Sequence, residues 1–453
     1  MPLAVVLILL ALGSVLFHFL SPWYFTPIAS NWSTIDQTIG ITFWVTGIVF
    51  VSISVFLAWA LIRYRHRSWR KDSRAVYEPE NKKLEWRLLI VTTLGVAAML
   101  APGLLVWAKF VNVPADADIV EVVAQQWNWS YRFPGQDGKL GTVDTRYVSD
   151  DNPFGMNPND PHGSDDVLVE SPELHLPLGR PVKLLLRSKD VLHDFAVAQM
   201  RVKMDFVPGL VSYLWFQPTR TGSFDLLCQE LCGIGHYAMR GRVVVDEPAA
   251  FQAWLAHQPT YAQMRARSPG DPVAGRALFA VCAGCHGANA EGNVAMHAPK
   301  LSGQATWYLE RQLKHFKLGE RGMQDKDAFG KTMAPMAATL ADDTAVANVV
   351  AYIASLPDAA PPTTIQGNED IGRQRFVTCA ACHGANAQGI AATQAPRLRG
   401  MSDWYLATQL KNFRDGTRGS HPQDIYGAQM GLIAGMLIDD AAIGDVIAYI
   451  NTR

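Results

Sequence analysis

This chain of 453 residues has almost no net charge, few cysteines and no long run of basic residues. The formal net charge is only −1 at pH 7. A protein that binds nucleic acid needs a clustered positive surface that contacts phosphates, so the sequence argues against such a partner. Cysteine occurs only six times. In an oxidising compartment, six cysteines would ordinarily pair as disulfides, and only their spacing can argue otherwise.

Apolar residues are concentrated in three runs near the start of the chain. The runs cover residues 3–20, 41–62 and 88–109, and each is close to the roughly 20 residues that cross a bilayer. The first run lacks a basic start and a small-residue cleavage site, so we expect an uncleaved helix rather than a secretory signal. Residues 63–74 hold six Lys or Arg. This predicts a cytoplasmic loop there, with the chain after about residue 110 on the outer side.

Two copies of a short cysteine motif indicate covalently bound haem rather than disulfides. The motifs are CAGCH and CAACH, and CxxCH is the attachment signature for c-type haem. The two thiols form thioethers with the haem vinyl groups, which brings the adjacent histidine to the iron. The predicted attachment residues are Cys282, Cys285 and His286 in the first copy and Cys379, Cys382 and His383 in the second.

The two motifs belong to a longer repeat with an offset of 97 residues (379 − 282). At this offset TWYLERQLKHF falls on DWYLATQLKNF without a gap, so the sequence contains two copies of one domain. Met333 and Met430 coincide, whereas Met336 and Met436 have no methionine opposite them. Methionine is mostly a core residue, but beside CxxCH we expect Met333 and Met430 to be the sixth iron ligands. His/Met ligation raises the reduction potential of a haem.

These motifs resemble the class I cytochromes c, and the pair resembles the dihaem cytochrome c4 group. The resemblance implies small all-α domains in which a C-terminal helix packs against an N-terminal helix. The three- and four-residue spacing of apolar residues in TAVANVVAYIASL independently predicts a helix. The expected C-terminal helices are 343–355 and 440–451, and the expected N-terminal helices are 273–281 and 370–378.

The middle of the chain has a different pattern. Between residues 113 and 250, short β-branched runs alternate with Pro, Gly and Asp, which is typical of an antiparallel all-β domain. Residues 149–166 are polar throughout most of their length, so we expect a surface loop there.

Residues 228–239, CQELCGIGHYAM, place two cysteines, a histidine and a methionine close together. A disulfide between Cys228 and Cys232 would leave His236 and Met239 without a role. Zinc has little use for a thioether, whereas copper accepts thiolate, imidazole and thioether ligands. Two thiolates four residues apart can bridge two copper ions, and such a centre needs a second histidine from elsewhere in the chain.

DVLHDFAV, RVKMDFVPG and CQELCGIGHYAM together resemble the soluble domain of cytochrome c oxidase subunit II, and the preceding helices resemble that family's membrane hairpin. The CuA loop of nitrous-oxide reductase is a poorer match. The resemblance implies an all-β, cupredoxin-like fold with a dinuclear copper centre, CuA. The Glu230 carbonyl would be one ligand, and the Glu230 side chain would face a magnesium ion shared with the catalytic subunit. The implied side-chain ligands are His193, Cys228, Cys232, His236 and Met239.

Two further residues match functional positions of this family. Trp127, in AQQWNWSYRF, resembles the residue through which electrons enter, although a large packing residue is the alternative. Glu85 resembles a glutamate at the mouth of a proton channel in the catalytic subunit. A carboxylate in the first turn of a helix is also favoured by the helix dipole alone, and the residues after Glu85 depart from the family pattern.

The sequence as a whole predicts the electron-input subunit of a haem-copper terminal oxidase. Electrons would pass from a donor, such as cytochrome c or another respiratory complex, through two haems c and CuA to a catalytic subunit that reduces oxygen to water with proton translocation. We expect subunit I and subunit III as partners, and a bacterial plasma (inner) membrane with the copper and haem domains on its periplasmic side. The alternatives are the same role in a CuA-type nitric oxide reductase and a stand-alone membrane-anchored electron carrier.

The expected organisation is multidomain, with transmembrane helices, an all-β copper domain and two all-α cytochrome domains. The predicted divisions are a membrane region at 1–112, a copper domain at 113–250, a linker at 251–269, a first cytochrome c domain at 270–357, a linker at 358–367 and a second cytochrome c domain at 368–453.

Overall fold

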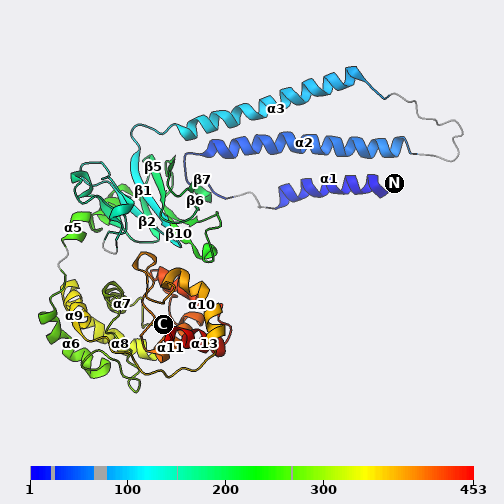
Figure 1. The fold of residues 1–453 in the computed structure, drawn as a ribbon. Coiled ribbons are helices and arrows are strands. Elements are labelled where there is room, and N and C mark those ends of the chain that lie inside the picture. Colours follow the sequence, from blue (N-terminus) through cyan, green and yellow to red (C-terminus); the bar gives the residue numbers. More distant parts are fainter. Residues whose placement is uncertain (1, 22–25, 66–78, 150–151, 267–268) are drawn as a thin grey trace.

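The computed structural model describes residues 2–21, 26–65, 79–149, 152–266 and 269–453. Three long helices extend from a β-sandwich toward the right in Figure 1, and two helical domains lie below the sandwich in that view. This arrangement bears out the predicted class of three apolar helices, a cupredoxin-like β domain and helical cytochrome domains. The basic loop predicted at residues 63–74 lies mostly outside the described residues.

The membrane helices are α1 (Pro2–Leu20), α2 (Ser33–Arg63) and α3 (Lys82–Val111), and each is long and apolar enough to span a bilayer. Most of their apolar side chains are exposed, as lipid-facing residues are. α1 packs against α2, and the residues buried in these two helices are all small, which lets helix backbones approach closely in a membrane. These residues are Ala4, Ala11, Ser54 and Ala58.

α2 and α3 extend beyond the apolar runs, and the first turn of α2 and the last turn of α3 contact the sandwich. The first turn of α2 carries Asp36, which forms an ion pair with Arg201 of the sandwich at 2.6 Å. At the end of α3, the carbonyls of Lys109 and Val111 accept hydrogen bonds from Trp215 and Tyr213. The copper domain is therefore attached directly to the membrane helices.

The sandwich consists, within the described residues, of two five-stranded sheets in the orders β3-β2-β1-β5-β8 and β4-β10-β9-β6-β7. β1 pairs with β5 and β10 with β4 in parallel, and the other pairs are antiparallel. Large side chains such as Trp129, Phe195 and Phe216 fill the space between the sheets. The strands are β1 Asp118–Gln125, β2 Asn128–Phe133, β3 Val167–Val169, β4 Glu173–Pro177, β5 Val182–Ser188, β6 His193–Val197, β7 Val202–Phe206, β8 Val211–Phe216, β9 Gly222–Leu227 and β10 Arg240–Asp246.

The expectation of a surface loop at residues 149–166 is wrong for part of that segment. Phe154 and Met156 are buried in a small cluster with Tyr261. Asp166 is fully buried and pairs with Arg132 at 2.7 Å. Most residues of this segment are polar, but its few apolar side chains and the Asp166 ion pair point into the domain and anchor the segment there. Two short helices, α4 (Pro248–Ala256) and α5 (Tyr261–Arg265), follow the sandwich.

The remaining helices form two domains with matching element order. The first contains α6 (Pro272–His286), α7 (Thr306–Leu318), α8 (Ala328–Ala338) and α9 (Asp343–Ser355), and the second contains α10 (Glu369–His383), α11 (Asp403–Arg414), α12 (Ile425–Ala434) and α13 (Asp440–Asn451). As expected from the cytochrome c resemblance, α6 packs on α9 and α10 on α13. Gly275 and Gly372 allow the two helices of each pair to approach closely, because a Cβ on either glycine would overlap a backbone carbonyl of the facing helix.

Candidate metal centre and haem pockets

The candidate copper residues come from neighbouring strands of one sheet. His193 begins β6, which pairs with β9. The segment carrying Cys228, Cys232, His236 and Met239 connects β9 to β10. Because β6 and β9 are adjacent, the second histidine that the loop lacks is supplied across the sheet.

The side chains of this cluster face one another over short distances. His193 Nδ1 is 3.1 Å from Met239 Sδ, and the Cys228 and Cys232 sulfurs are 3.7 Å apart. Cys232 Sγ lies 3.5 Å from His236 Nδ1 and 3.8 Å from Met239 Sδ. All five predicted side chains are thus brought together, and His193, Cys228 and Cys232 are buried.

The donor set fits copper. The two sulfurs are much farther apart than the roughly 2.05 Å of a disulfide, and both thiols are free. The hydrogen bond between them is the largest influence on their ionisation: it lowers the pKa of Cys228 to about 3 and raises the pKa of Cys232. Thiolate, imidazole and thioether groups around one point suit copper.

Asp190 orients the histidine of this cluster. Its carboxylate accepts a hydrogen bond from His193 Nε2 at 2.7 Å, which leaves Nδ1 directed at the sulfur atoms. The same carboxylate accepts hydrogen bonds from the backbone amides of Gln126 and Val191, both at 2.7 Å. A carboxylate that fixes the tautomer and direction of a ligating histidine is a common second partner of a metal site.

Glu230 has two separate roles in the structure. Its backbone carbonyl accepts a hydrogen bond from Cys228 Sγ at 3.2 Å, which places that oxygen beside the cluster. Its carboxylate forms an ion pair with Lys203 of β7 at 2.9 Å. Magnesium coordination by this carboxylate stays a prediction, and the group it contacts within the described residues is a lysine.

Each predicted haem attachment motif is the last turn of a helix. His286 ends α6 and His383 ends α10, and the Nδ1 atom of each bonds to a proline carbonyl at 2.8 Å, that of Pro299 or Pro396. This leaves Nε2 of each ring available to an iron. Burial lowers the pKa of both histidines, which favours the neutral ring that iron ligation requires.

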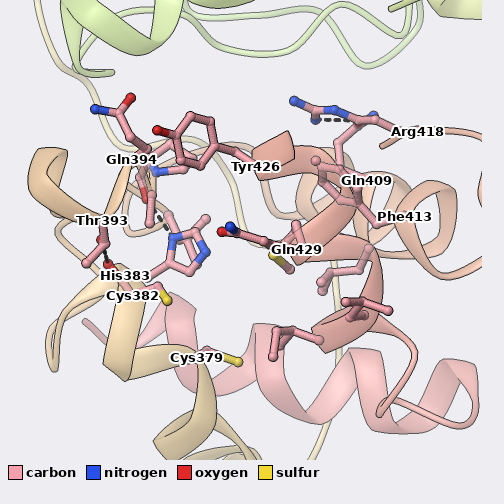
Figure 2. A pocket seen from close by; sticks show the side chains of 18 of the residues that line it. Cys379, Cys382, His383, Thr393, Gln394, Gln409, Phe413, Arg418, Tyr426 and Gln429 are labelled. Atoms are coloured by element: carbon pink, nitrogen blue, oxygen red, sulfur yellow. Dashed lines mark hydrogen bonds between the residues drawn. The ribbon is translucent and has the colours of Figure 1, made fainter. Parts of the chain in front are cut away.

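A mainly apolar cavity of about 230 Å³ adjoins the second motif. His383 and Met430 both line it, and Figure 2 shows the Cys382 sulfur near the His383 ring and the Cys379 sulfur farther along the same helix. The predicted proximal and sixth ligands of this domain therefore share one cavity. Met333 occupies the equivalent position on α8 of the first domain.

Buried arginines between the two helical domains fit the carboxylates of a haem. Arg321 donates to the Tyr405 hydroxyl at 2.7 Å, and Arg418 donates to the Tyr308 hydroxyl at 3.0 Å, so each arginine reaches across to the other domain. Within the described residues, the Nε atoms of Arg311, Arg321 and Arg418 are buried and have no hydrogen-bond partner. Haem propionates are anionic acceptors that would satisfy such donors.

Trp127 contacts the metal loop, whereas Glu85 caps the start of a membrane helix. Trp127 is buried, and its Nε1 donates to the Cys232 carbonyl at 3.1 Å, so the indole contacts the metal loop directly. Glu85 lies in the first turn of α3, where its carboxylate accepts a hydrogen bond from the backbone amide of Asn81 at 3.2 Å. Helix capping therefore accounts for the position of Glu85, and proton entry there stays a prediction.

The motif-based prediction missed Asp190, Lys203, Arg321 and Arg418. The two arginines had a detectable signal, because they coincide at the 97-residue offset as the methionines do. Asp190 and Lys203 are single residues near the metal residues, and nothing in their spacing indicates their contacts.

Comparisons with known proteins agree with the two kinds of site. Residues 119–247 match the family described as cytochrome c oxidase subunit II, periplasmic domain, and residues 272–357 and 370–453 match cytochrome c. Alternative cytochrome c oxidase subunit 2 of Bradyrhizobium diazoefficiens is 57% identical over 268 residues, which cover 59% of this chain and 96% of that protein.

Cytochrome c4 of Pseudomonas aeruginosa is 34% identical over 161 residues, covering 34% of this chain and 76% of that protein. The crystal structure of reduced cytochrome c4 from Pseudomonas stutzeri is similar over 40% of this chain and 97% of that chain, with 27% identity and a TM-score of 0.33.

The fold and the sites define a membrane-anchored electron-transfer protein in which a copper-binding β-sandwich is fused to cytochrome c domains. The chain belongs to the cytochrome c oxidase subunit II family, and its C-terminal part is homologous to cytochrome c4. This membership implies CuA copper and haem c as cofactors, an electron-input role and the other subunits of a haem-copper oxidase as partners.

Proposed function

We propose that this chain passes electrons from an external donor, by way of two c-type haems and CuA, to the catalytic subunit of a terminal oxidase that reduces oxygen to water. The observation that carries the proposal is the combination in one chain of a five-residue copper donor set and two CxxCH helices. These groups would supply one-electron redox chemistry without making or breaking substrate bonds.

The chain's own residues would hold these groups in place. His193, Cys228, Cys232, His236 and Met239 would ligate copper with the Glu230 carbonyl. In the cytochrome domains, the cysteines of each motif would attach a haem, with His286 and Met333 or His383 and Met430 as the iron ligands. The buried His286 and His383 rings would limit the reorganisation that accompanies electron transfer.

The assembly around the chain follows from the same proposal. Subunit I would carry the oxygen-reducing centre and translocate protons, subunit III would complete the complex, and the donor would be cytochrome c or another respiratory complex. The complex would lie in a bacterial plasma membrane with the copper and haem domains facing the periplasm. Glu230 would contribute to an interfacial magnesium site, and Glu85 to proton entry.

Purification of the complex in mild detergent tests the proposal. We expect two covalently bound haems and one copper pair per chain, a mixed-valence CuA signal in the electron paramagnetic resonance spectrum, and oxygen uptake with reduced cytochrome c. Nitric oxide consumption without oxygen uptake would establish the nitric oxide reductase alternative instead. Isolation of the chain without a catalytic subunit would favour a stand-alone carrier, and absence of the copper signal would refute the CuA assignment.

A further inference from the structure

The copper domain is contacted directly by the second cytochrome domain. Two hydrogen bonds join α12 to the turn between β1 and β2. The Tyr426 hydroxyl accepts from Asn128 Nδ2 at 2.6 Å, and Gln429 Nε2 donates to the Trp127 carbonyl. Tyr426, Gln429 and His383 all line the same cavity (Figure 2).

The contact continues from this turn to the metal loop. Trp127 Nε1 and Gln126 Nε2 both donate to the carbonyl of Cys232, at 3.1 and 2.8 Å. Gly235 lies so close to the Trp127 indole that a Cβ at this position would overlap the ring. Cys382, one of the predicted attachment cysteines, packs against the hydrophobic core of the copper domain. Trp127 and the metal-loop residues Ile234, Gly235 and Tyr237 line the cavity of the second domain directly.

The two residues that make this contact are absent from the first copy of the repeat. At the 97-residue offset, Phe329 occupies the position of Tyr426 and Thr332 the position of Gln429. Phenylalanine has no hydroxyl to accept a hydrogen bond, and threonine is too short to reach a facing backbone. Thr332 is exposed, whereas Gln429 is partly buried. Among the differences between α8 and α12, these two remove the groups that bond to Asn128 and Trp127.

The first domain is attached to the second at a different place. Arg321 and Arg418 donate across the boundary between the two domains to Tyr405 and Tyr308. Lys300, which is buried, also donates to the Gly400 carbonyl at 2.8 Å. Hydrogen bonds thus join the copper domain to the second cytochrome domain, and the second cytochrome domain to the first.

We propose that Tyr426 and Gln429 are positioning residues that fix the second cytochrome domain as the direct electron donor to the copper domain, and that the first cytochrome domain accepts electrons from outside. In this step the second cytochrome domain is oxidised by one electron and the copper domain is reduced by one. The inference rests on the proposed function, because it requires both haems and the copper pair to be loaded. The rate of electron tunnelling falls steeply with the distance between donor and acceptor, so a variant in which the two domains separate transfers electrons more slowly.

The test uses the full chain in its complex, with the double variant Tyr426→Phe/Gln429→Thr, which installs the residues of the first copy. The matched control is Phe329→Tyr/Thr332→Gln, which installs the same groups on the exposed α8. Amide hydrogen exchange is measured over residues 126–129 and 232–238. Loss of two neutral hydrogen bonds is expected to raise exchange there about tenfold or more in the first variant, and the control is expected to match the parent protein.

Light-triggered reduction under anaerobic conditions provides the second readout. Electrons injected into the cytochrome domains are followed by the haem absorption and by the near-infrared absorption of CuA. Their arrival at copper is expected to slow at least tenfold in Tyr426→Phe/Gln429→Thr and to be unchanged in the control. Cys379→Ala/Cys382→Ala, which removes the second haem, is expected to abolish rapid transfer, whereas Cys282→Ala/Cys285→Ala is expected to preserve it.

Unchanged exchange and unchanged transfer in Tyr426→Phe/Gln429→Thr would overturn the positioning role. Rapid transfer that survives Cys379→Ala/Cys382→Ala but is lost in Cys282→Ala/Cys285→Ala would overturn the order of the domains. Either result leaves the haem content and the CuA signal of the parent protein intact. Failure of the proposed function is distinguishable, since it removes those signals from the parent protein itself.

Discussion

Asp190 offers a sharp test of how the copper site is organised. Its two carboxylate oxygens accept hydrogen bonds from His193 Nε2 and from the amides of Gln126 and Val191. Burial raises the pKa of Asp190, but these hydrogen bonds outweigh burial and keep the pKa below its usual value. The residue is therefore an anion that both holds the imidazole in place and fixes the turn before Trp127.

Asp190→Asn preserves the shape of the side chain but exchanges one acceptor for a donor. Either His193 or the Gln126 amide then faces an NH2 group, so one hydrogen bond is lost and the imidazole is no longer held with Nδ1 toward the sulfurs. Loss of such a partner of a metal ligand typically costs about 10–100-fold in metal affinity, which is about 1.4–2.8 kcal/mol. We expect this loss in a competition titration of copper against a chelator of known affinity.

Asp225→Asn is the matched control, because Asp225 is an exposed residue of β9 in the same sheet. Its copper affinity is expected to equal that of the parent protein. Thermal unfolding of each copper-free variant shows whether the fold itself has changed. Equal copper affinity in Asp190→Asn and the parent protein would refute the argument that Asp190 orients His193.

Two further predictions concern stability. Gly275→Ala places a Cβ against the Asn348 carbonyl and is expected to destabilise the first cytochrome domain by about 1–3 kcal/mol. A thermal midpoint equal to that of the parent protein, followed by haem absorption, would contradict the helix-packing argument. Burial raises the pKa of Glu121, but its ion pairs with Arg132 and Arg187 lower the pKa below the usual value of 4.5. A carboxyl group whose pKa is lowered by folding stabilises the fold above its unfolded pKa, and this stabilisation is lost as the pH falls. We therefore expect the urea concentration at the unfolding midpoint to decrease when the pH is lowered below about 4.5, and to decrease less in Glu121→Gln. An identical pH dependence in the variant would contradict this prediction.

Much of the candidate chemistry could be predicted from the sequence because it depends on residues close together along the chain. A CxxCH motif is read within five residues, and the 97-residue offset identifies two domains and the paired methionines. The loop from Cys228 to Met239 contains four candidate ligands in twelve positions. His193 lies outside this loop and reaches it only across the paired strands β6 and β9, so the family resemblance was needed to identify it.

Contacts between distant segments could not be predicted in this way. The polar segment that includes Phe154 packs because Tyr261, more than 100 residues later, completes its apolar cluster. The carboxylate of Glu230 meets Lys203 because β7 pairs with β6, the strand that carries His193. Neither contact has a periodicity or spacing that indicates it.

By itself, the sequence determined the membrane helices, the all-β copper domain, the two cytochrome domains and the types of cofactor, because local patterns and short motifs specify them. Only the tertiary structure decided that Asp190 orients His193 and which cytochrome copy meets the copper domain. The two copies are almost equivalent in their haem motifs. Among the positions where the copies differ, Tyr426 and Gln429 bond to the copper domain, because folding brings the Asn128 and Trp127 groups opposite them.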